Sequence, residues 1–168
     1  MMFMNTKKFT LTAMFAALAC VATLVIHIPS PTNGYMNLGD AVVLLGAFFL
    51  GPWCGAIAGG VGSALSDLIL GYTAYVPATL IIKGLMGLCA GLIAAKSKKF
   101  SFTLLASIIA EIIMVGGYYL YEVILAKNFA TPLTGIPSNL CQARIGLVAG
   151  CLLYTVLSKN KYISTFLQ

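Results

Sequence analysis

Long apolar runs, separated by short polar or charged segments, fill almost the whole of this 168-residue chain. A helix needs about 20 apolar residues to cross the hydrocarbon core of a bilayer, and six such segments leave almost no room for a soluble domain. About a quarter of an average soluble sequence is charged, whereas only 8% of this one is. The sequence therefore predicts a single integral membrane domain over residues 1–168.

We expect an all-α bundle of six transmembrane helices. The second helix is short, because Gly51-Pro52 ends it and leads the chain directly into the third. At about 1.5 Å per residue it covers only about 20 Å, so it tilts, begins in the preceding loop or does not span fully. The predicted spans are residues 9–28, 38–50, 53–71, 77–95, 101–125 and 138–157.

The basic residues between the runs predict the orientation. With six spans, all but one of them fall on the same side of the membrane, and the exception is Lys127. Lysine and arginine are enriched in cytoplasmic loops, so both termini are expected in the cytoplasm. The lysines on the cytoplasmic side are Lys7, Lys8, Lys96, Lys98, Lys99, Lys159 and Lys161. The loops 27–37, 72–76 and 126–137 are then expected outside.

Composition and motifs exclude several classes of function. The net charge of +6 does not indicate a nucleic-acid partner, because the basic residues form short clusters between apolar runs rather than one face. Five scattered cysteines and one histidine, His27, predict neither a metal site nor a disulfide framework. Gly60-Val61-Gly62 lies within an apolar run and matches no nucleotide-binding loop. We expect no cofactor, and any ATP hydrolysis must come from a partner.

All four acidic residues lie inside or at the ends of predicted spans, where a charge costs about 2.5–3.5 kcal/mol at the bilayer centre. Helix depth places five charged residues in the outer third of the membrane, with Asp40 at the outer surface, where the second span begins. Polar and aromatic side chains at the same level include Asn37, Tyr72 and Asn139, a composition typical of a small-molecule pocket. For any single charge, an internal ion pair is an equal alternative, either Asp67 with Lys83 or Glu122 with Arg144. The five charged residues are Asp40, Asp67, Lys83, Glu122 and Arg144.

Glu111 lies about 16 Å below Glu122 on the same face of its helix, too deep for the outer pocket. A buried carboxyl at this depth leaves open a stand-alone proton-coupled carrier that uses Glu111 and Glu122. An intramembrane enzyme using Asp67, Glu122 or His27 ranks last, because no nucleophile, base and orienting group can be assembled from the sequence.

Several short motifs follow one another in a specific order. Ala13 and Ala17 stand four residues apart in the run Thr12–Ala19. The run Gly34–Asp40 includes the sequence N-L-G-D, and later come L-G-P-W at residues 50–53 and G-S-A-L-S-D at residues 62–67. Gly71-Tyr72 and Lys83-Gly84 complete the series. In this order the motifs resemble those of the substrate-binding S-component of energy-coupling factor (ECF) vitamin transporters, over all six spans and most sharply between Thr12 and Gly91.

The resemblance implies a six-helix protein of the prokaryotic plasma membrane that binds a vitamin on its outer side. It also implies partners, namely a transmembrane coupling subunit and two ATPase subunits, with Ala13 and Ala17 on the docking face. The N-L-G-D and G-Y motifs are most similar to the branch for pyridoxine and hydroxymethylpyrimidine, which is related to the riboflavin branch.

The resemblance and the depth estimates together give the candidate ligand-binding residues. The position of the family motifs points to Asn37, Asp40, Asp67, Tyr72 and Lys83. The depth estimate alone points to Glu122, Asn139 and Arg144.

Overall fold

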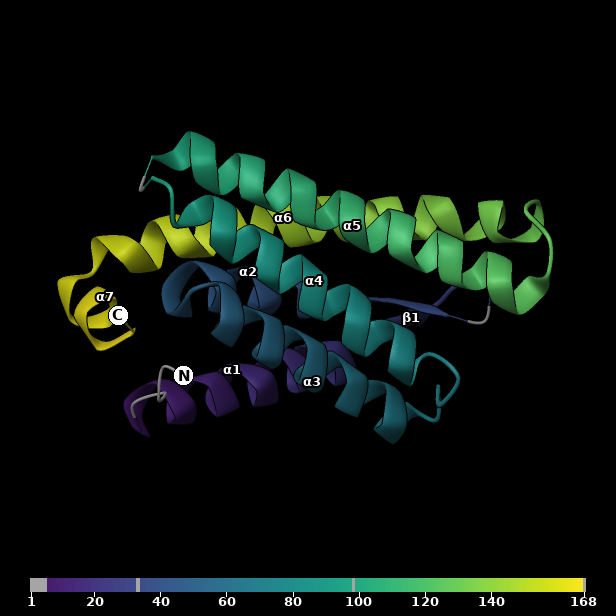
Figure 1. Ribbon diagram of the computed structural model, residues 1–168, viewed down its shortest axis with the longest axis horizontal. Helices are drawn as coiled ribbons and strands as arrows, with labels where there is room; N and C mark the ends of the chain where they lie inside the picture. Colours follow the sequence, from purple (N-terminus) through teal and green to yellow (C-terminus); the bar gives the residue numbers. More distant parts are fainter. Residues whose placement is uncertain (1–5, 33, 98, 168) are drawn as a thin grey trace.

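The computed structural model describes residues 6–32, 34–97 and 99–167, and helices occupy each of the six predicted apolar runs (Figure 1). These helices are α1 (Thr6–Val25), α2 (Gly39–Leu50), α3 (Pro52–Leu70), α4 (Val76–Ala94), α5 (Phe100–Ala126) and α6 (Ile136–Lys159). A further short helix, α7 (Lys161–Leu167), follows α6 and was not predicted. In the bundle, α1 and α3 lie on one side, while α5 and α6 lie on the other.

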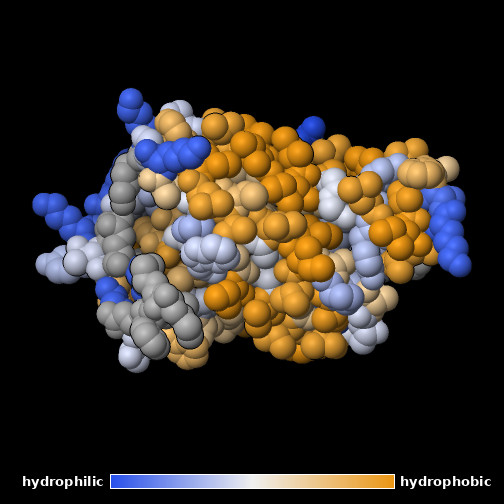
Figure 2. Space-filling model, viewed as in Figure 1, coloured by the Kyte–Doolittle hydropathy of each residue, from blue (hydrophilic) through white to orange (hydrophobic). Residues whose placement is uncertain are grey.

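The surface of the bundle is that of a membrane protein. Five helices are long and apolar enough to cross a bilayer, whereas α2 has only 12 residues. Figure 2 shows hydrophobic side chains across the middle of the molecule and hydrophilic ones gathered toward its two ends. Large apolar side chains such as Ile69, Ile112 and Leu152 are exposed. Such a surface is stable only against lipid, so the chain is a multi-pass membrane protein.

The short helix α2 forms the centre of the bundle and packs against α1, α3, α4 and α6. Most of its side chains are buried, including Leu44. Gly51 joins α2 to α3 with φ +87°, a backbone conformation that favours glycine. Because Gly55 has no side chain, α3 lies close to α2: a Cβ there would be 2.6 Å from the Cα of Ala47.

A β-hairpin stands where the sequence predicts a plain loop. Strand β1 (His27–Pro29) pairs antiparallel with β2 (Tyr35–Asn37), with His27 opposite Asn37. Strand β2 leads the chain to the start of α2, so Asp40 is completely buried (0% exposed) among the helices. The prediction that Asp40 lies at the outer surface is therefore wrong, because Lys83 of α4 and Gln142 of α6 both bind its carboxylate inside the bundle.

The loops and chain termini gather at the two opposite ends of the bundle, here called the hairpin end and the termini end (Figure 1). At the hairpin end, the β-hairpin meets the α3–α4 loop at residues 71–75 and the 3₁₀ helix η1 (Thr131–Gly135). At the termini end lie the start of α1, the α4–α5 link and α7. There Lys7 Nζ donates a hydrogen bond of 3.4 Å to the carbonyl oxygen of Thr165.

Candidate functional site

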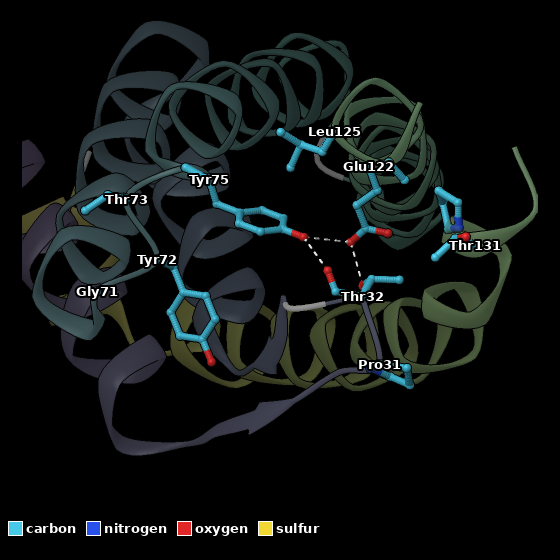
Figure 3. Close-up of a pocket in the computed structure, with 12 residues that line it drawn as sticks. Pro31, Thr32, Gly71, Tyr72, Thr73, Tyr75, Glu122, Leu125 and Thr131 are labelled. Atoms are coloured by element: carbon cyan, nitrogen blue, oxygen red, sulfur yellow. Dashed lines mark hydrogen bonds between the residues drawn. The ribbon is translucent and has the colours of Figure 1, made fainter. Parts of the chain in front are cut away.

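A cavity of about 400 Å³ opens at the hairpin end (Figure 3). Four segments enclose it: residues 31–32 of the hairpin loop, residues 71–75, the last turn of α5 and the start of η1. Its volume lies within the range of small-molecule sites, roughly 300–1,000 Å³. The three loops that the sequence predicts on one side of the membrane therefore meet around one cavity.

Glu122, in the last turn of α5, is the acidic residue of this cavity. Its Oε1 accepts a hydrogen bond of 2.8 Å from Thr32 Oγ1. The Tyr75 hydroxyl donates to the Thr32 carbonyl oxygen at 2.8 Å and lies 3.5 Å from the same Glu122 oxygen (Figure 3). Glu122 is only 5% exposed, and its Oε2 has no hydrogen-bond partner among the described residues. A ligand with a hydrogen-bond donor would satisfy that oxygen.

A second, inner cavity of about 20 Å³ lies next to the first, and Tyr75 and Glu122 line both. On its wall, Asp67 accepts a hydrogen bond from the Tyr35 hydroxyl through Oδ1. The Oδ2 of Asp67 is buried without a partner in the described part of the chain. Asn37 and Asn139 also line this inner cavity. The hydrogen bonds among Thr32, Tyr75 and Glu122 therefore lie between the outer and the inner cavity.

Tyrosine rings surround both cavities. Tyr72 lies between Tyr35 and Tyr75, with ring centroids 4.7 and 6.5 Å away, and Tyr75 lies 6.5 Å from Tyr118. Burial, followed by the charge of Asp67, raises the pKa of the Tyr35 hydroxyl, while burial and then Glu122 raise the pKa of Tyr75. Both hydroxyls therefore stay protonated at neutral pH and act as donors. Flat rings of this kind favour a flat, aromatic ligand.

Asp40 and Lys83 form a buried ion pair that lines neither cavity. Gln142 Nε2 donates a 2.7 Å hydrogen bond to Asp40 Oδ2, and the backbone N–H of Asn37 donates to Gln142 Oε1 at 2.8 Å. This network joins α2, α4, α6 and β2. The alternative pairing of Asp67 with Lys83 is wrong, because the lysine reaches Asp40 from α4 while Asp67 contacts the hairpin. For Asp40 and Lys83, the geometry favours positioning of Asn37 over ligand contact.

The comparisons with known proteins agree with this architecture. The family model of the ECF-type riboflavin transporter S component matches residues 3–159. The chain belongs to this family. As an S-component it is a transport protein and not an enzyme.

Two relatives and one solved structure extend the assignment. A protein of Pyrococcus woesei without assigned function is 35% identical over 141 residues, covering 83% of this chain and 94% of that protein. The thiamine precursor transporter HmpT of Lactococcus lactis subsp. cremoris is 29% identical over 164 residues, covering 96% and 94%. The structure of ThiT from Listeria monocytogenes superposes with a TM-score of 0.71 at 15% identity, covering 95% and 96%, which shows a shared fold.

Arg144 stands apart from the cavities of the S-component. It is exposed on α6, at a groove between α5 and α6, and no carboxylate of the described residues lies within 4 Å of it. The alternative pairing of Glu122 with Arg144 is therefore wrong, because the two side chains leave their helices on different faces. The sequence predicts the same depth for Arg144 and Glu122, but an ion pair would also require Arg144 to lie on the face of α6 that points toward Glu122.

Glu111 lies outside both cavities, as its depth predicts. It packs beside Asp40 where α6 contributes Gly146: a Cβ on that glycine would be 2.6 Å from Glu111 Oε1 and 2.7 Å from Asp40 Cβ. Neither carboxylate oxygen of Glu111 has a hydrogen-bond partner among the described residues. Nothing in this geometry connects Glu111 to Glu122 as a proton path would require.

Two residues of the site were not singled out from the sequence, Thr32 and Tyr35. Both belong to the hairpin, and each donates a hydrogen bond to a carboxylate on a helix distant in sequence: Thr32 to Glu122 and Tyr35 to Asp67. The only local signal is the pair of short runs 27–29 and 35–37, separated by Pro31 and Gly34, which is typical of a hairpin.

The ion pair of the S-component predicts a large effect on stability. Lys83→Met leaves Asp40, which is 0% exposed, as a buried charge without its partner. We expect the free energy of unfolding to fall by about 3–5 kcal/mol. The double variant Asp40→Asn/Lys83→Met should recover most of the loss, since it removes both charges. Thermal unfolding in detergent measures the change, and equal stability of Lys83→Met and the parent would contradict the pairing.

Proposed function

We propose that this S-component captures a thiamine precursor of the hydroxymethylpyrimidine class in the cavity at the hairpin end. In this proposal six helices cross a prokaryotic plasma membrane, with the hairpin end outside and both termini in the cytoplasm. The lysines near the termini end support the orientation, because basic residues concentrate on the cytoplasmic side.

The observation that carries the proposal is Glu122 Oε2, a buried carboxylate oxygen of a residue that lines the cavity, without a hydrogen-bond partner among the described residues. A buried acceptor left without a donor costs about 1–3 kcal/mol or more when charged, so a ligand that supplies donors gains affinity. Hydroxymethylpyrimidine has a flat ring that carries an exocyclic amine and a hydroxymethyl group at neighbouring positions. We infer that the amine donates to Glu122 and that the ring lies against Tyr72 and Tyr75.

Pyridoxine is the second candidate. It is also flat and carries hydroxyl donors, but it has no exocyclic amine. The relative HmpT is named as a thiamine precursor transporter, which supports a pyrimidine over a pyridine. Both ligands belong in the same binding experiment, since the amine is the group that distinguishes them at Glu122.

Binding requires the cavity to open and close. Thr32 holds the hairpin loop to Glu122, and Tyr75 holds the 71–75 loop to the carbonyl of Thr32. The Thr32 hydroxyl occupies only Oε1 of Glu122, so the ligand donates to Oε2 and leaves this contact between hairpin and helix in place. The two loops then close over the ligand, which excludes water from the charged hydrogen bond.

Delivery to the cytoplasm is proposed to need a transmembrane coupling subunit and two ATPase subunits. Ala13 and Ala17 are exposed on α1 and line an apolar groove of about 450 Å³ against Ile57, Val61 and Leu65 of α3. Small residues on a lipid-facing helix let another helix approach closely. This groove supports docking of the coupling subunit on the α1–α3 face.

Uptake of radiolabelled hydroxymethylpyrimidine into proteoliposomes tests the whole proposal. With the S-component and an ECF module reconstituted together, we expect accumulation only when ATP is present on the ATPase side. Accumulation by the S-component alone, driven by a pH gradient, would contradict the proposal and favour the proton-coupled carrier.

A further inference from the structure

A second groove lies between α5 and α6 and shares no lining residue with the ligand cavities. Its volume is about 440 Å³, and its wall is mostly apolar. Apart from Glu111 and Arg144, the lining consists of apolar residues and Gly116. No part of the described chain covers the groove, so it faces the surroundings of the protein.

Arg144, the only arginine of the sequence, gives the groove its positive charge. Its guanidinium is exposed within an apolar helix and has no carboxylate within 4 Å in the described chain. Exposed charge inside a membrane-spanning segment is costly, and such residues normally have a partner. All four acidic residues lie in the described part, so the partner anion must come from another molecule.

The level of Arg144 along α6 matches a lipid headgroup. From Arg144 to Lys159 the helix rises only about 22 Å, which is less than the roughly 30 Å of the hydrocarbon core. Long basic side chains extend toward the headgroups at both ends and make up the difference. The guanidinium therefore reaches the phosphate layer on the hairpin side while the groove below it faces acyl chains.

We propose that the α5–α6 groove binds a phospholipid of the phosphatidylglycerol type. The phosphate binds Arg144, and one acyl chain lies along Ile108, Ile112 and Leu147. A protein occupant is disfavoured, because Figure 1 places α5 and α6 on the opposite side of the bundle from α1, whose groove fits the coupling subunit.

The test is native mass spectrometry of the protein released from nanodiscs that contain equal amounts of phosphatidylglycerol and phosphatidylcholine. One basic residue near a membrane surface favours anionic lipid by about fivefold, so the parent should retain phosphatidylglycerol over phosphatidylcholine by about this factor. Arg144→Gln should lower the ratio to about one. Lys127→Gln is the control, because Lys127 is also exposed but does not line the groove, and it should keep the parent ratio.

Filling the groove provides an independent variant. A Cβ at Gly116 would meet no atom within 4 Å, so Gly116→Leu occupies the groove without a clash inside the protein. It should reduce both bound phospholipids, whereas Cys141→Leu, at an exposed α6 position outside the groove, should not. Parent protein without bound phospholipid, or a parent-like ratio in Arg144→Gln, would overturn the proposal. An equal loss in Lys127→Gln would also overturn it, since any surface charge would then serve.

Discussion

Glu122→Gln is expected to weaken binding of hydroxymethylpyrimidine by about 10- to 100-fold, because a hydrogen bond to a charged group contributes about 1.5–3 kcal/mol. Glutamine keeps the size of the side chain and one acceptor oxygen. It replaces Oε2, which has no partner among the described residues, with an amide that donates, so the ligand amine meets another donor instead of an acceptor. Titration of the purified protein measures the dissociation constant.

Glu111→Gln is the matched control for this substitution. Glu111 is 4% exposed, similar to Glu122 at 5%, and its oxygens also have no partner in the described part of the chain, but it lines neither ligand cavity. We expect its affinity to stay within about threefold of the parent, a difference of about 0.65 kcal/mol. Equal losses in both variants would mean that charge neutralisation acts through stability, and the assignment of Glu122 to the ligand would be wrong.

Ala13→Trp is expected to abolish ATP-dependent uptake while leaving ligand affinity near that of the parent. The bulky ring would fill the groove of α1 and α3, and close helix contact depends on small side chains. The position lies toward the termini end of α1, far along the helix from the ligand cavities (Figure 1). Co-purification with the coupling subunit and uptake into proteoliposomes provide the two measurements.

Leu18→Trp is the control for docking, because Leu18 is exposed on the same helix but does not line the groove. This variant should keep both uptake and co-purification. If Ala13→Trp supports normal uptake, the α1–α3 groove is not the docking surface. If affinity falls while the complex persists, Ala13 serves packing within the bundle instead.

The helices were predictable from sequence because each apolar run is close to the length that a bilayer requires. The hairpin was not, since each of its strands has three residues, too few for an alternating pattern to appear. Its absence from the prediction also led to the error at Asp40. A depth estimate assumes that each span begins at the membrane surface. Helix α2 instead follows β2 directly and begins inside the bundle.

The composition of the candidate site was easier to predict than its pairing. Glu122, Asp67 and Tyr72 lie at the cavities because charges and tyrosines near the same helix ends meet when the ends meet. Which carboxylate pairs with Lys83 depends on how α2, α4 and α6 are rotated, and depth along a helix carries no such information. Arg144 shows the same limit, since it has the expected depth but lies on the outward face of α6.

Titration calorimetry of the purified S-component with hydroxymethylpyrimidine and pyridoxine, without ATP and without added metal, tests the central proposal most directly. We expect saturable binding of one molecule per chain, with hydroxymethylpyrimidine preferred by at least about tenfold, or about 1.4 kcal/mol, because only this compound carries the exocyclic amine that the proposal pairs with Glu122. Absence of binding by either compound, or tighter binding of pyridoxine, would contradict the assignment of this cavity to an aminopyrimidine.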